Sequence, residues 1–96
     1  MRKEVLTMTI RINNRDELQK ILLFICKNFK CNYNPFEFLV EISSQISAML
    51  PFGEVSEVQI EYLETFAEIT FTIKDLRTSF FPPRTRKIKY QFDFEI

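Results

Sequence analysis

Apolar and polar residues alternate with a period of two in four segments of the chain. Such alternation is typical of strands that bury one face and expose the other. In the first segment it predicts a strand over 6–12 with four residues toward the core, namely Leu6, Met8, Ile10 and Ile12. The other three segments predict strands over about 57–62, 67–73 and 88–96.

Between the first two strands, apolar residues recur at helical spacing instead. They predict a helix over about 15–29 and a second helix that begins at Pro35 and ends before Pro51. Asn14 and Asn34 each precede a glutamate by three positions, which is the spacing of a capping box at a helix start. Two helices joined by a short link form an antiparallel hairpin.

This order of elements predicts an α+β fold, β-α-α-β-β-β, with two layers. A four-stranded antiparallel sheet with the helical hairpin on one face explains why every strand has a single apolar face. The length of 96 residues favours one domain over 1–96. The alternative is a single broken helix that crosses over and leaves the first two strands parallel.

Composition supports an ordered, packed chain. Apolar residues make up 46% of it, with 11 Phe and only one Gly, so disorder is a poor interpretation. The longest apolar run covers only residues 21–26, far below the roughly 20 residues that span a bilayer. No continuous apolar stretch follows the basic residues at the start, so we expect a cytoplasmic protein without a membrane segment.

The residues that usually perform catalysis are scarce. The absence of histidine removes the commonest general base, and a single glycine excludes the usual phosphate-binding loops. Zinc sites need four ligands, so Cys26 and Cys31 are interpreted as small buried apolar residues. We therefore expect a protein that is not an enzyme, with no catalytic residues, metal or cofactor.

Charge is distributed unevenly along a chain whose net charge is zero. Residues 31–70 hold seven acidic groups and no Lys or Arg, whereas the segments before and after carry net charges of +4 and +3. Outward strand positions and the neighbouring turns predict one acidic partner-binding surface, formed by Glu54, Glu57, Glu61, Glu64 and Glu68. Like charges on neighbouring strands repel. Either this surface binds a basic partner, or Arg11 and Lys89 neutralise it as cross-strand pairs.

The segment 75–87 is the longest irregular stretch that the pattern predicts, too long for a tight hairpin. It combines two aromatic residues, a Pro-Pro step and several basic residues. The candidate binding residues here are Arg77, Phe80, Phe81, Arg84, Arg86 and Lys87. The aromatic rings could cover an edge of the core, anchor a protein partner, or stack on bases while the cations neutralise phosphates.

These features favour a small protein-binding module, an inhibitor or accessory factor, over an enzyme. A composition rich in Ile, Phe, Lys and Asn, which have A/T-rich codons, suits a phage or mobile element. Such elements encode inhibitors of host defence or transcription, CRISPR inhibitors among them. Two alternatives remain: a nucleic-acid-binding module that uses the basic loop 77–89, and a subunit that forms a homodimer through its last strand.

Overall fold

The computed structural model describes residues 6–77 and 82–94. Their elements follow the predicted order and lie at β1 (Leu6–Arg11), α1 (Arg15–Asn28), α2 (Pro35–Met49), β2 (Gly53–Tyr62), β3 (Phe66–Asp75) and β4 (Thr85–Asp93). The four strands form one sheet in the order β1-β2-β3-β4, and each neighbouring pair is antiparallel. The α+β prediction is therefore confirmed, and the alternative with parallel first strands is wrong.

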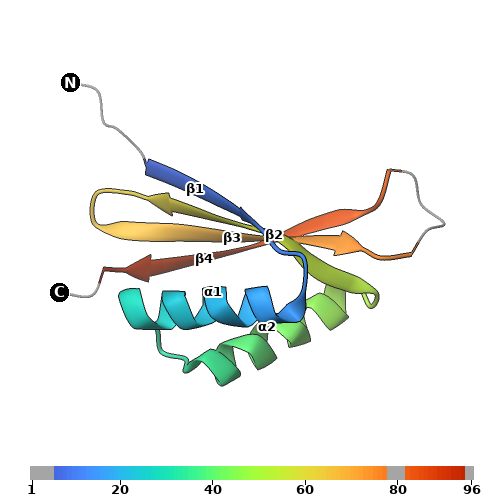
Figure 1. The fold of residues 1–96 in the computed structure, drawn as a ribbon, viewed down its shortest axis with the longest axis horizontal. Helices are drawn as coiled ribbons and strands as arrows, with labels where there is room; N and C mark the ends of the chain where they lie inside the picture. The colour runs from blue at the N-terminus through green and yellow to red at the C-terminus, as the bar shows by residue number, and fades with distance from the viewer. Residues whose placement is uncertain (1–5, 78–81, 95–96) are drawn as a thin grey trace.

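Both helices lie on the same side of the sheet (Figure 1). The helices have 14 and 15 residues, and within the two described segments none is long and apolar enough to cross a membrane. An antiparallel helix pair returns the chain to the end of the sheet from which it left. β2 therefore runs antiparallel to β1, and β3 and β4 follow it as a meander.

Side-chain caps fix where the helices begin, as the sequence predicts. The Asn14 side chain accepts a hydrogen bond from the Glu17 amide (3.0 Å), and the Glu17 carboxylate accepts one from the Asn13 amide (2.8 Å). At α2, Asn34 and Glu37 form the reciprocal capping box, with Pro35 at the first helical position. These bonds satisfy amides that a helix start would otherwise leave without partners.

Phe38 on α2 is the centre of the contact between the two layers. Its side chain is fully buried, and its ring lies against four other aromatic rings at centroid distances of 5.1–5.9 Å, namely Tyr33, Phe71, Tyr90 and Phe92. α2 therefore covers β3 and β4. Phe29, the residue that follows α1, contacts β2, because its ring lies 5.9 Å from that of Tyr62.

The edge strand β1 departs from the expectation that its four apolar residues are in the core. Only Ile12, which leads into α1, is buried, whereas Leu6 is 68% exposed and Met8 37% exposed. Met8 pairs with the buried Ile60, so the alternation assigns the correct face. Burial increases along β1 toward α1, from the exposed Leu6 to the half-buried Ile10 and the buried Ile12.

A β-bulge at Ser56 lengthens β2 beyond the predicted segment. The register shifts there, with Val55 opposite Ile73 and Glu57 opposite Thr72. The extra residue lets Val55 and Val58 both be buried although they are three positions apart. β2 begins at Gly53, where a Cβ atom would lie 2.7 Å from the Ile73 side chain, so a larger residue fits only if that side chain shifts.

The connection between β3 and β4 is shorter than the predicted 75–87 loop. β3 continues to Asp75 and β4 begins at Thr85, so the connection spans residues 76–84. The Asp75 amide donates to the Arg84 carbonyl (2.8 Å) and closes its base. The sequence prediction failed here because the first three residues of β4, Thr85, Arg86 and Lys87, are all polar and show no alternation. They form a strand because they pair with β3.

Replacing Phe38 tests how much the stability depends on the aromatic cluster. We expect Phe38→Ala to lower the free energy of unfolding by about 3–5 kcal/mol, because it leaves a cavity among four rings. Phe36→Ala is the matched control on the same helix, since Phe36 is 73% exposed; it should change stability by less than about 0.5 kcal/mol. Denaturant unfolding measures both. Equal losses would contradict the assignment of Phe38 to the core.

Tyr90 makes the free energy of unfolding depend on pH in the alkaline range. Burial, with the Glu41 charge nearby, raises the pKa of the Tyr90 phenol to about 12. The unfolded phenol ionises near pH ~10, so the stability from neutral Tyr90 is complete below that pH. It is lost as the pH rises through about 12. Unfolding free energies measured across this window should fall more steeply for the natural chain than for Tyr90→Phe; parallel curves would refute this.

Candidate functional site

Three predicted acidic residues lie together on the sheet face opposite the helices. Glu57, Glu61 and Glu68 alternate along β2 and β3 with residues whose side chains are buried under the helices, among them Val58, Ile60, Ala67 and Ile69. Their side chains are only half-buried, and no helix covers them. We call these three residues the acidic row. The position of all three on the face opposite the helices agrees with the sequence prediction.

The strand register determines which charges within the acidic row are neutralised. Glu61 lies directly opposite Glu68, so two like charges face each other across β2 and β3. Lys89 Nζ on β4 lies 2.8 Å from Glu68 Oε1, and this ion pair, with the Glu61 charge, raises the pKa of Lys89. One predicted cross-strand pair is thus present, and it leaves Glu61 without an ion pair to any described residue.

Arg11 is the second basic residue that the sequence placed beside the acidic row. It lies directly opposite Glu57 in the register of β1 and β2. Arg11 is exposed, and no ion pair joins it to Glu57 among the described residues. The neighbouring positions on this face include threonines, namely Thr7, Thr9, Thr70 and Thr72. The acidic row is therefore only partly neutralised.

Asp93 extends the acidic end of this face, and the sequence analysis did not include it. It is exposed at the end of β4, opposite Phe66. It is an even number of positions from Lys89, so both side chains point to the same face of the sheet. Alternation alone indicates that Asp93 points outward. Its proximity to the acidic row depends on the β3–β4 register, which the sequence does not reveal. Glu64 is exposed in the turn between β2 and β3, at the same end of the sheet.

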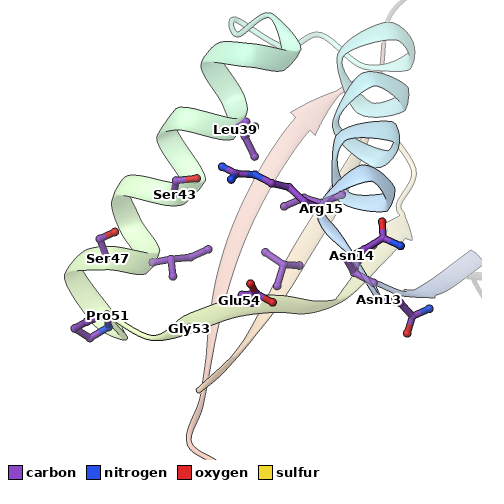
Figure 2. Close-up of a pocket in the computed structure, with 13 residues that line it drawn as sticks. Asn13, Asn14, Arg15, Leu39, Ser43, Ser47, Pro51, Gly53 and Glu54 are labelled. Carbon is purple, nitrogen blue, oxygen red and sulfur yellow. The ribbon is translucent and has the colours of Figure 1, made fainter. Parts of the chain in front are cut away.

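Glu54 does not belong to the acidic row. It lies beyond the bulge, near the start of β2, and lines a cavity of about 260 Å³ between the N-terminus of α1 and α2. Figure 2 shows it next to Gly53, on the strand that passes below the two helices. The bulge, which the sequence pattern does not show, keeps Glu54 on the same face as Glu57, but Glu54 lies opposite Lys74, at the other end of β2 from Glu61.

The cavity is framed by polar side chains over an apolar floor. Arg15 from α1 extends between the helices toward Leu39 and Ser43 of α2 (Figure 2). Of the nearby amides, that of Glu17 donates to the Asn14 side chain and that of Asn13 to the Glu17 carboxylate. In the described segments, no buried side-chain nitrogen or oxygen lacks a hydrogen-bond partner. Nothing in this arrangement specifies a ligand, so we assign none.

The first basic residue of the predicted loop site, Arg77, is held in a structural contact. It forms an ion pair with Asp75 (2.6 Å), donates from Nε to both carboxylate oxygens, and lies over the Phe52 ring at 5.2 Å. The Asp75 side chain is fully buried, and its hydrogen bonds from Arg77 lower the pKa of Asp75. This arrangement fixes the start of the β3–β4 connection.

The remaining loop candidates lie at the other end of the connection or outside the described residues. Arg84 ends the connection, while Arg86 and Lys87 belong to β4, opposite Ile73 and Thr72. All three are exposed. Phe80 and Phe81 lie outside the described residues. The structure therefore gathers the basic groups at one end of the sheet, at the opposite end from Asp93 and Glu64.

Neither a metal site nor a known relative points to a function. Over residues 6–77 and 82–94, no group of three or more cysteine or acidic side chains is arranged to hold a metal ion. Comparisons with known protein families, with curated proteins and with solved structures find no match to this chain. The function has to be argued from the surface itself.

Substitutions in the acidic row test the balance of its charges. Glu61→Gln should raise the free energy of unfolding at low salt by a few tenths of a kcal/mol, because it removes the repulsion across β2 and β3. Glu68→Gln should give no such gain, because it also removes the partner of Lys89. Thermal unfolding of both variants at low and high salt measures the difference. Identical shifts would refute the charge arrangement.

Proposed function

We propose that this protein is a small, non-enzymatic protein-binding module whose acidic row contacts a basic surface on its partner. The observation that carries the proposal is the position of Glu57, Glu61 and Glu68 on a sheet face that no helix covers. A cytoplasmic location, an inhibitory or accessory role, and an origin in a phage or mobile element belong to the same proposal and rest on composition.

The electrostatics of the acidic row favour a binding role. Glu61 and Glu68 face each other directly, and Lys89 neutralises only one of them. Placing like charges directly opposite costs stability, so the arrangement is unfavourable for the free protein. A basic partner would relieve the repulsion on binding. Complementary charge also accelerates association and makes the complex sensitive to salt.

The shape of the face suits contact with a macromolecule better than with a small molecule. The acidic row lies on a sheet face with threonines at neighbouring positions, and the cavity next to Arg15 lies on the other side of β2. Small-molecule sites are concave and mostly apolar. A polar sheet face with graded charge presents instead an extended surface for a partner of opposite charge.

Charge reversal on β2 tests the proposal. The purified protein is immobilised, incubated with lysate at low salt, and the proteins retained are eluted by a salt gradient and identified. We expect a basic protein to be retained by the natural chain, to elute as salt rises, and to be lost with Glu57→Lys and Glu61→Lys together. Association rates of the identified pair should fall at least tenfold with this double variant.

Asp16→Lys is the matched control, because Asp16 is an exposed acidic residue in the first turn of α1, on the helix layer. It changes the net charge in the same direction without altering the sheet face. Binding should survive this change. The proposal fails if the partner binds the Glu57→Lys, Glu61→Lys variant as tightly as the natural chain, or if Asp16→Lys weakens binding as much per unit charge.

A nucleic-acid-binding function is the second candidate, favoured by the basic end of the sheet. Lys74, Arg84, Arg86 and Lys87 lie there, and the ends of β3 and β4 extend past the helices (Figure 1). A gel shift with DNA and RNA separates the two functions. Tight, salt-dependent binding that disappears with Arg84→Glu and Arg86→Glu would favour this candidate over a protein partner.

Self-association through the last strand is checked in the same preparations. β4 lies at an edge of the sheet, so one side of its backbone is available for pairing with another copy, except at its end, where the Lys30 amide donates to the Asp93 carbonyl. Light scattering across the micromolar range gives the mass. A dimer that persists at high salt would show that the exposed edge, rather than the acidic row, forms the contact.

A further inference from the structure

The two cysteines of the chain meet where α1 connects to α2. Cys26 lies in the last turn of α1, and Cys31 follows it in the connection to α2. Their Sγ atoms are 3.8 Å apart, both side chains are half-buried, and both are free thiols. The interpretation of Cys26 and Cys31 as small buried apolar residues does not account for this contact.

The backbone around the pair is anchored to the sheet. Phe29 is buried and forms an isolated bridge with Phe94, and the Lys30 amide donates to the Asp93 carbonyl (2.9 Å). The segment between the two cysteines is thus fixed on both the helix and the sheet side. The Sγ atoms have to approach by a further ~2 Å to bond, a displacement on the scale of a side-chain rotation.

We propose that Cys26 and Cys31 form a reversible intramolecular disulfide in the folded protein, in exchange with a low-molecular-weight disulfide such as oxidised glutathione. In the first step one cysteine attacks the glutathione disulfide and releases one reduced glutathione. In the second step the other cysteine attacks the mixed disulfide and releases the second. The two protein thiols are oxidised, one disulfide of glutathione is reduced, and each released thiolate takes up the proton of a protein thiol.

The surroundings set the order of these two steps. Burial raises the pKa of the Cys26 thiol to about 12, and the hydrogen bond with Cys31 acts in the same direction. The thiolate is the attacking species, so Cys26 is a poor first nucleophile. Cys31 therefore forms the mixed disulfide, and Cys26 resolves it from 3.8 Å away. The short distance compensates for the scarcity of the Cys26 thiolate, because the second step is intramolecular.

The disulfide would restrain the connection between the helices where it contacts the end of the sheet. It closes a short covalent loop around Phe29 and Lys30, the residues that join α1 to β4. Local opening of this region then requires the loop to move as a unit, so the Lys30 amide should exchange with solvent more slowly. In a reducing cytoplasm the thiols stay reduced, and under oxidising conditions the disulfide forms.

The test is redox equilibration of the folded natural chain with mixtures of reduced and oxidised glutathione, followed by acid quenching, alkylation and mass spectrometry. We expect a monomer that is two hydrogens lighter and resists alkylation, with an unchanged circular dichroism spectrum. Hydrogen exchange at Lys30 should slow at least tenfold in the oxidised form, and a reductant should reverse both changes. Because this comparison uses one chain in two redox states, it does not depend on any variant folding.

Single substitutions identify the role of each thiol. Cys26→Ser should accumulate the stable glutathione adduct on Cys31, whereas Cys31→Ser should form its adduct on Cys26 more slowly, because the burial of Cys26 remains. Three results would overturn the proposal: thiols that stay reduced until denaturant is added, a glutathione adduct that persists in the natural chain, or a disulfide between two chains. Each shows that the folded protein does not bring the two sulfur atoms into bonding distance.

Discussion

The contact of Phe38 with the apolar face of the sheet is the interaction on which the rest of the structure depends. Its ring contacts aromatic residues of β3 and β4, and α2 is held there by its capping box and by Gln45, whose amide donates to the Tyr90 hydroxyl (2.8 Å). Burial of these rings is the largest favourable contribution that a small core has available. Because both helices are committed to one face, the other face stays open to solvent.

The local signals in the sequence were sufficient to predict the element order and the helix starts. Capping by Asn14 and Asn34 and the period-two alternation each act within a few residues, so they can be identified without tertiary information. Three features were missed because they depend on pairing between distant segments. They are the bulge at Ser56, the start of β4 at Thr85, and the exposure of Leu6 on the edge strand.

The candidate site shows the same division between local and long-range information. Alternation predicted that the acidic row lies on one face, but the register decided that Glu61 faces Glu68 and that Lys89 neutralises only the latter. Glu54 lies apart from the acidic row because the register puts it opposite Lys74, near the start of β2, where it also lines the cavity. Arg77 was predicted as a binding residue, yet its guanidinium is bound to the buried Asp75. Composition alone does not distinguish such a structural cation from an available one.

Two properties of the fold bear on its use, and they come from separate regions. The sheet face carries acidic groups at one end and basic groups at the other, which gives the molecule a charge gradient along its strands. The thiol pair lies at the helix connection, next to the backbone bond between Lys30 and Asp93. Asp93 also borders the acidic end of the sheet, so the two regions are neighbours in the fold.

The sidedness of the sheet is tested most directly by nuclear Overhauser effects from the Phe38 ring in solution. The account predicts strong effects to the rings of Phe71, Tyr90 and Phe92, and none to side chains of the open face such as Glu61. Effects from the Phe38 ring to Glu61 or its neighbours would contradict it, since the acidic row would then lie beneath the helices rather than open to a partner.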